Sequence, residues 1–168
     1  MSKLGLNEVD IEPGHSQKGQ HSYIQKVFEH IGTTNKYYVD IGAYDGRTNS
    51  NVYDLKVNDN WYGLMIDNNC ADPELNLHKH TVTQENICSI LKQYSVPYVI
   101  DLLCIDIDGM DYWILKSILQ HFSPRVIVIE TNTRFGSTEN KVMKYDETYS
   151  WDGLNWYGCS PHAVKKLV

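Results

Sequence analysis

Four oxygen-bearing side chains follow two apolar runs in the second half of the chain. Asp106 and Asp108 end one run, and Glu130 and Asn132 follow the next. Neighbouring parallel strands end at the same edge of a sheet, so these side chains are expected to meet at one rim. Residues two apart in a strand share a face, so Asp106 and Asp108 are expected to converge. Such a group of oxygen ligands suits Mg²⁺ or Ca²⁺, and either aspartate can instead act as a general base for a substrate hydroxyl.

A plainer interpretation gives the same residues separate roles. Asp106 would hold the amino group of a cofactor, Asp108 would cap the following helix, and Glu130 would be a structural acid. The sequence leaves both interpretations open. In the first, Asp106, Asp108, Glu130 and Asn132 bind a metal ion, and Asp106 and Asp108 are the catalytic residues.

A glycine turn follows the first apolar run, at residues 37–46. Asp40 stands at the carboxyl end of that run, and Gly42 and Gly46 follow in a G-x-x-x-G pattern. The dinucleotide fingerprint requires G-x-G-x-x-G, and here Tyr44 occupies a position where a diphosphate needs open backbone. The spacing therefore disfavours NAD and FAD and favours a cofactor without a diphosphate, such as S-adenosylmethionine. A tight turn that binds no ligand is the alternative.

A second acid, Asp67, ends the next apolar run, 21 residues after Gly46. An acid at this place in a Rossmann-like fold typically binds the ribose of a nucleotide. One carboxylate can accept hydrogen bonds from both ribose hydroxyls, and we expect Asp67 to do so. The alternative is a solvated loop acid beside Asn68 and Asn69.

Apolar runs and helical periodicities alternate along the chain, which predicts the α/β class. We expect a Rossmann-like, doubly wound, mostly parallel sheet of about five strands in one domain of residues 1–168. Within that domain, residues 1–19 form an N-terminal arm, and residues 133–168 form a tail loop with a short helix. The predicted strands are 36–40, 61–66, 80–83, 98–108 and 125–130, and the predicted helices are 23–31, 52–57, 72–77, 85–94, 114–119 and 161–168.

Composition narrows the classes of partner. The net charge is −6 at a pI near 5.6, and the chain lacks a Lys/Arg cluster, which argues against nucleic acid. The four cysteines have no metal or redox spacing and are expected to be reduced. The chain shows neither a signal peptide nor a membrane span, so we expect a cytoplasmic protein that does not bind membranes. Most histidines are scattered, but His21 opens the first helix, where the arm can cover a pocket.

Several segments resemble the FkbM-like class I S-adenosylmethionine-dependent methyltransferases. The resemblance extends over about residues 16–165, and its most specific part is Asp106 to Tyr112. The segments that carry it are Ser16–Gln20, Val39–Gly46 with Ser50-Asn51, Trp61–Gly63, Glu85–Ile87, Asp101–Gly109 with Asp111-Tyr112, Val126–Glu130 with Asn132, and Trp151–Gly153 with Tyr157-Gly158.

The resemblance implies roles for individual residues. Asp40, Gly42 and Gly46 would line the methionine end of the cofactor, and Glu85 would lie near the adenine. Asp67 would bind the ribose, and Asp106 would face the methyl group and the substrate. The cofactor-binding set implied is Asp40, Gly42, Ala43, Tyr44, Gly46, Asn51, Asp67, Glu85 and Asp106.

The chain departs from this family at its C-terminal end, because the usual sixth and seventh strands are missing. An exposed edge on the fifth strand is then expected to be covered by a homodimer or by the tail aromatics Tyr145, Tyr149, Trp151, Trp156 and Tyr157. The leading function is methyl transfer to a hydroxyl of a small molecule or sugar. The alternatives are a non-catalytic or truncated Rossmann-like binding module and, less favoured, a nicotinamide-dependent oxidoreductase.

Overall fold

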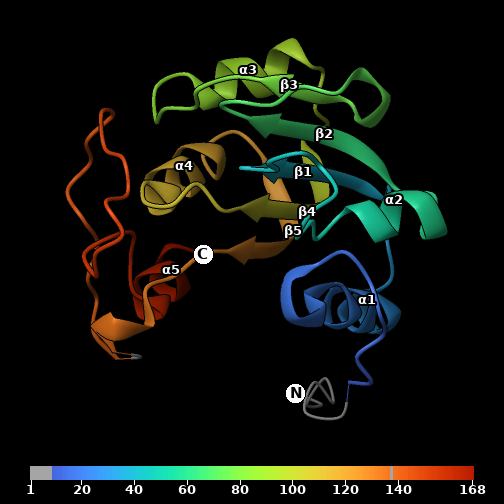
Figure 1. The fold of residues 1–168 in the computed structure, drawn as a ribbon, viewed down its shortest axis with the longest axis horizontal. Coiled ribbons are helices and arrows are strands. Elements are labelled where there is room, and N and C mark those ends of the chain that lie inside the picture. Colours follow the sequence, from blue (N-terminus) through green and yellow to red (C-terminus); the bar gives the residue numbers. More distant parts are fainter. Residues whose placement is uncertain (1–8, 137) are drawn as a thin grey trace.

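Five strands form one sheet in which every neighbouring pair runs parallel, in the order β3-β2-β1-β4-β5 (Figure 1). The computed structural model describes residues 9–136 and 138–168, so the first eight residues of the predicted arm lie outside the described residues. The strands are β1 (Tyr37–Ile41), β2 (Tyr62–Asp67), β3 (Leu77–Lys79), β4 (Val99–Ile105) and β5 (Ser123–Ile129). The helices are α1 (Gln20–Ile31), α2 (Tyr53–Asp59), α3 (Ile87–Gln93), α4 (Asp111–Ile118) and α5 (Pro161–Leu167).

Helices cover both faces of the sheet, because the strands present apolar side chains on both sides. On one face, Ile90 of α3, Ile114 of α4 and Val164 of α5 pack against the strands. On the other face, Ile24 of α1 and Leu55 of α2 do so. The predicted α/β fold, Rossmann-like and doubly wound, is therefore confirmed, with a sheet that is parallel throughout.

The third strand begins three residues earlier than predicted. It runs from Leu77 to Lys79 instead of 80–83, because Leu77 fills the core and pairs with Met65 of β2. The predicted helix at 72–77 is only a 3-10 turn at Pro73–Leu75, which ends at a left-handed Asn76. Residues 80–83 leave the sheet and line the cavity described below.

The first helix ends at Gly32 as predicted, since the Gly32 N–H donates to the Phe28 carbonyl at 2.8 Å. Its buried stripe is narrower than expected. Ile24 and Phe28 lie one helical turn apart and are buried, whereas Tyr23 and Ile31 are exposed. The two exposed residues stand at the margins of the apolar stripe and do not belong to its centre.

The tail after β5 folds over the carboxyl-terminal end of the sheet, on the side toward which the strands point (Figure 1). The Trp113 indole of α4 donates to the Met143 carbonyl at 2.9 Å and holds the tail there. Trp151 and Trp156 remain 46% and 69% exposed. The prediction that the tail aromatics cover the edge of β5 is wrong, because their contacts lie at the strand ends. A homodimer formed through that edge stays a prediction.

Smaller expectations agree with the structure. Ser160 caps α5, since its Oγ accepts the Ala163 N–H at 3.1 Å, and Pro161 is the first helical residue, as predicted. The four cysteines are unpaired. Within residues 9–136 and 138–168, every helix is too short or too polar to span a membrane.

Asp101 is a fully buried acid that ties three parts of the fold together. It sits in β4 and accepts the backbone N–H groups of Thr34, Asn35 and Lys36 at 2.7–2.9 Å, just before β1 begins. Its other oxygen accepts a hydrogen bond from Nη1 of Arg125 in β5 at 2.7 Å. Burial alone would raise the pKa of Asp101, but the Arg125 guanidinium and the backbone donors outweigh burial and lower that pKa.

Asp101→Asn is therefore expected to lower the free energy of unfolding by about 3 kcal/mol, because Arg125 loses its charged partner. Urea unfolding measures this, with the exposed-acid variant Asp10→Asn as control. The lowered pKa means that the stabilisation is present above the usual carboxyl pKa and is lost as the pH falls through the folded value, so the two proteins should converge in acid. A variant as stable as wild type at neutral pH would contradict the assignment.

Candidate functional site

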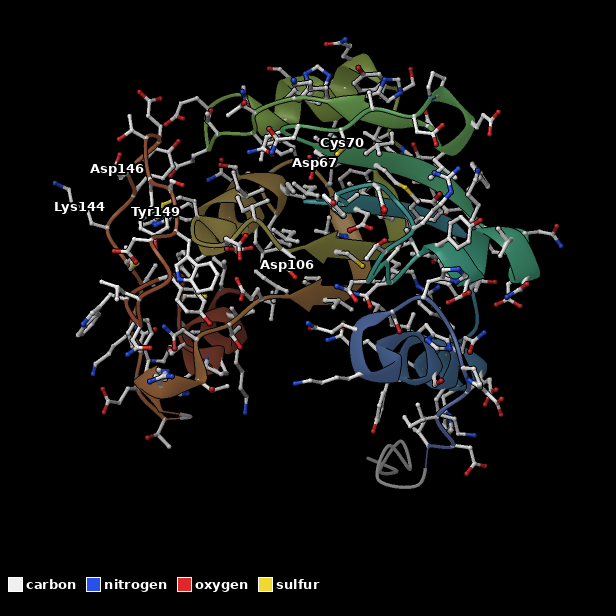
Figure 2. All side chains as sticks on the ribbon, in the orientation of Figure 1. Asp67, Cys70, Asp106, Lys144, Asp146 and Tyr149 are labelled. Atoms are coloured by element: carbon white, nitrogen blue, oxygen red, sulfur yellow. The ribbon has the colours of Figure 1, made fainter. Side chains whose placement is uncertain are left out.

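A cavity of about 690 Å³ opens at the carboxyl ends of the strands. It lies at the switch point of the sheet, because β2 and β4 stand on opposite sides of β1. Figure 2 shows Asp67 and Asp106 at this end, with Tyr149 of the tail beyond them. The predicted site residues that line it are Asp40, Gly42, Ala43, Tyr44, Asn51, Asp67, Asp106, Asp108 and Glu130. Gly46, Glu85 and Asn132 are not among its lining residues.

The two glycines of the turn are required by contacts within the protein. Gly42 has φ +88°, and a Cβ atom there would lie 1.8 Å from the Asp106 carbonyl oxygen. Gly46 has φ +73°, and a Cβ atom there would lie 2.7 Å from Leu75. Gly42 thus lets the ends of β1 and β4 touch and also borders the cavity, whereas Gly46 only packs against apolar side chains.

Asp67 is a buried acid that shapes two loops, and the alternative of a solvated loop acid is wrong. Its Oδ2 accepts the Tyr44 N–H at 2.9 Å, and its Oδ1 accepts the N–H groups of Asn69 at 2.7 Å and Cys70 at 3.1 Å. A carboxylate has about four acceptor positions, so about one remains for a ligand. Asp67 can therefore bind one ribose hydroxyl, and the expected contact with both does not fit. An alanine here would also release both loops.

The remaining predicted cofactor contacts differ in position. Asn51 borders the cavity, and its buried Oδ1 lacks a hydrogen-bond partner among the described residues. Tyr44 borders it with a left-handed backbone, φ +51°, and a side chain that is mostly exposed. Glu85 lies on the surface and accepts the Tyr145 hydroxyl at 2.7 Å, so it holds the tail and does not line the cavity.

Three predicted acids do come together. One oxygen from each of Asp106, Asp108 and Glu130 lies within 4.8 Å of the others, and we call these residues the acid cluster. Burial and the neighbouring charges of Asp111 and Asp108 raise the pKa of Asp106 to about 6. Burial raises the pKa of Glu130 to about 7, and the negative charges of Asp106, Asp111 and Asp108 contribute in the same direction.

The reason for this convergence differs from the expected one. β4 ends at Ile105, so Asp106 and Asp108 are loop residues, and Asp108 has a left-handed backbone, φ +57°. The strand rule that residues two apart share a face therefore does not apply. Asp108 reaches its neighbours because the turn reverses the chain.

Asp111, which the sequence interpretation did not assign a role, holds that turn. It is fully buried in the first turn of α4, and its two oxygens accept the N–H groups of Ile107 and Gly109, both at 2.9 Å. The signal was present in the sequence as an acid at the start of a helix, two residues after a glycine. Asp111 is therefore a positioning residue of the loop before α4, and no side chain of the described residues caps the start of that helix, so the capping role considered for Asp108 is not found.

Asn132 is turned away from the acid cluster. Its amide donates to the carbonyls of Asn155 at 2.8 Å and Tyr157 at 3.1 Å, and its oxygen accepts the Arg134 N–H. These contacts anchor the tail to the end of β5. We therefore leave Asn132 out of the candidate metal ligands.

The tail forms one wall of the cavity through Tyr145, Glu147 and Tyr149. The ring of Tyr149 packs against Gly109, where an added Cβ atom would lie 2.3 Å from it. The backbone N–H of Asp146 points at the Met110 sulfur, at 3.5 Å. The wall thus rests on the same loop that carries the acid cluster. The sequence indicated a functional tail only by its length and aromatic content.

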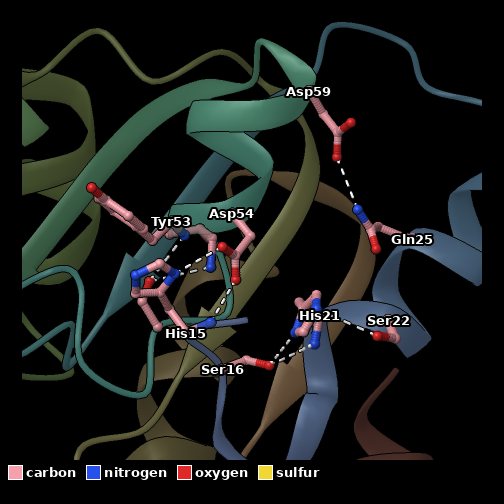
Figure 3. Close-up of polar contacts among 10 residues, drawn as sticks. His15, Ser16, His21, Ser22, Gln25, Tyr53, Asp54 and Asp59 are labelled. Atoms are coloured by element: carbon pink, nitrogen blue, oxygen red, sulfur yellow. Dashed lines mark hydrogen bonds and ion pairs between the residues drawn. The ribbon is translucent and has the colours of Figure 1, made fainter. Parts of the chain in front are cut away.

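His21 has a local structural role (Figure 3). Its Nδ1 lies 2.6 Å from the Ser16 Oγ, which also accepts the His21 backbone N–H at 2.9 Å. His21 is buried and is not part of the cavity lining. The arm nevertheless reaches the cavity through Gln17, next to Gln20 of α1, which also lines it. That the arm covers the pocket stays a prediction.

Charge is the most distinctive property of the cavity. Burial and the nearby carboxylates of Asp106 and Asp67 raise the pKa of Asp40 to about 7. Lysine and arginine are absent from the described residues that line the cavity. The acids that line it are Asp40, Asp67, Asp106, Asp108, Glu130 and Glu147.

The fold and the cavity define an α/β protein with a Rossmann-like sheet and an acidic cavity at its switch point. No protein-family model matches this chain, and neither a curated protein nor a solved structure matches it. The resemblance to FkbM-like methyltransferases therefore stays a prediction.

Gly109→Ala tests the contact between the tail and the loop. The added methyl group has to displace the Tyr149 ring, while the backbone of residue 109 is free of left-handed strain. We expect proteolysis in the tail near Lys144 to become faster, with the stability of the sheet domain changed by less than about 0.5 kcal/mol. Limited trypsin digestion with mass spectrometry measures the rate. Cleavage at the wild-type rate in Gly109→Ala would show that Tyr149 does not hold the tail.

Proposed function

We propose that this protein is an S-adenosylmethionine-dependent methyltransferase that acts on a hydroxyl group of a small molecule or sugar. The observation that carries the proposal is the charge of the cavity at the switch point. Six carboxyl groups and no Lys or Arg are found among its described lining residues. Such a site favours a cationic ligand and repels a diphosphate.

S-adenosylmethionine has the chemistry that this cavity favours. It carries a sulfonium, an ammonium and one carboxylate, so its net charge is +1. Gly42 and Ala43, just after β1, would border the methionine part of S-adenosylmethionine, as the resemblance implies. The Asp40 carboxylate would accept a hydrogen bond from its ammonium group. Asp67 has about one free acceptor position for a ribose hydroxyl. The size of the cavity, about 690 Å³, falls within the range of small-molecule sites.

The proposed reaction transfers a methyl group in one displacement. The acceptor oxygen forms a bond to the methyl carbon while the carbon–sulfur bond breaks, and its electron pair stays on sulfur to give a thioether. The hydroxyl proton passes to a carboxylate, for which Asp106 is suited because its raised pKa of about 6 lies near neutrality. Holding the two reactants in line provides most of the rate.

Calorimetric titration of the purified protein tests the proposal. We expect S-adenosylmethionine and S-adenosylhomocysteine to bind and NAD not to bind. NAD binding would favour the oxidoreductase alternative instead. If none of the three binds at millimolar concentration, the methyltransferase proposal fails and a non-catalytic binding module is favoured.

Asp40→Asn separates ligand binding from folding. Asp40 is only 7% exposed, and its pKa is raised by burial and by Asp106 and Asp67, without a hydrogen bond that stabilises the charge. The neutral, equally sized amide should leave the urea midpoint unchanged or raise it. Affinity for S-adenosylmethionine should fall about tenfold to hundredfold, since a hydrogen bond to a charged group is lost. Asp10→Asn is the matched control, and wild-type affinity in Asp40→Asn would remove Asp40 from the binding site.

A further inference from the structure

The acid cluster has the spacing of a binding site for one cation. One oxygen each from Asp106, Asp108 and Glu130 lies within 4.8 Å of the other two. Ligands on opposite sides of Ca²⁺ are about 4.6–5.2 Å apart, and those across Mg²⁺ are about 4 Å apart. A single divalent ion therefore fits between the three oxygens, with a small contraction in the case of Mg²⁺.

Two carboxyl groups without hydrogen-bond partners among the described residues, Asp40 beside the cluster and Glu130 within it, point to a missing counter-charge. Asp40 is more than nine-tenths buried and lines the same cavity, and its carboxylate accepts no hydrogen bond from the described residues. Asp40 pairs with Cys104 of β4, and Cys104 pairs with Val128 of β5. Asp106 and Glu130 follow just after the ends of these two strands, next to Asp40 along the sheet. The Oε2 atom of Glu130 is buried and also lacks a partner.

The protein itself supplies little positive charge here. The described lining of the cavity contains no Lys or Arg, and Asp111, which follows the cluster at the start of α4, already accepts two backbone N–H groups. Asp106 and Asp108 are exposed and Glu130 is half-buried, so the carboxylates whose charge is costly without a cation or a proton are those of Asp40 and Glu130. The proposed cofactor brings one net positive charge, which can balance Asp40 but not the cluster as well.

We propose that Asp106, Asp108 and Glu130 bind one divalent metal ion. The ligands are all carboxylate oxygens, which favours Mg²⁺, Mn²⁺ or Ca²⁺ over Zn²⁺ or Cu²⁺. With three protein ligands, an ion that takes six ligands would have about three positions left for other groups. This step rests on the proposed function. The free positions would bind the hydroxyl of the methyl acceptor and a neighbouring oxygen of the same molecule, so the methyl acceptor would be a vicinal diol or a hydroxy-carbonyl compound. The ion would then acidify the hydroxyl, whose proton would pass to solvent, and Asp106 would be a ligand of the ion in place of its role as proton acceptor.

Titration with Mn²⁺ alone, followed by electron paramagnetic resonance, tests the site. We expect one bound ion per chain that Mg²⁺ displaces. Asp108→Asn and Glu130→Gln should each weaken Mn²⁺ binding at least tenfold, as expected for the loss of a metal ligand. Asparagine tolerates the left-handed backbone of residue 108, so the first variant should fold. Asp10→Asn, which removes an exposed acid, should bind Mn²⁺ within twofold of wild type.

A second measurement on the wild-type chain does not depend on variants that fold. Substoichiometric Mn²⁺ should selectively broaden the amide resonances of Ile107 and Ile129, which flank the acid cluster. Broadening spread over the tail acids, equal affinity in wild type and both variants, or no binding at millimolar Mn²⁺ would each overturn the proposal.

The two proposals fail separately. Site-specific Mn²⁺ binding without binding of S-adenosylmethionine would retain the metal site and remove the proposed methyltransferase. Binding of S-adenosylmethionine without Mn²⁺ binding would remove the metal site and leave the methyltransferase in place.

Discussion

The contact between Gly42 and the Asp106 carbonyl sets the geometry of the whole site. No side chain fits between the two, because a Cβ atom on residue 42 would lie 1.8 Å from that oxygen. The ends of β1 and β4 can therefore approach closely, and the loops that follow them diverge only beyond this point. The cavity is the space opened by that divergence; Asp106 and Asp108 stand on the loop that leaves the contact after β4, whereas Asp40 and Asp67 belong to β1 and β2 and Glu130 follows β5.

Much of the fold could be predicted because its physical causes are local. Apolar runs in the strands, Gly32 after the first helix and Ser160 before the last each act through neighbouring residues, and the structure places those elements within a few residues of the predictions. The third strand was misplaced because Leu77 is set by its partner Met65 in β2. A short strand with one buried residue carries too little pattern to locate.

The site was predictable in its ligand types but less so in its geometry. Acids at the strand ends are visible in the sequence, and three of them do converge. Which acids pair with backbone groups depends on loop conformation, and so Asp67 and Asp111 proved to hold loops while Asp40 stayed unpartnered. The side chain of Asn132 turned toward the tail because backbone carbonyls more than twenty residues away were available to it. Contacts at that separation leave no periodic signal.

The tail wall has a consequence for how this fold can diversify. Tyr145, Glu147 and Tyr149 border the cavity, yet the segment that carries them lies outside the sheet and its two helical layers. Substitutions in such a segment change the shape of the entrance at little cost to the core, because surface loops tolerate variation better than packed elements do. Descendants of one gene could therefore come to admit differently shaped molecules by altering this segment alone, while the switch point and its acids were inherited intact.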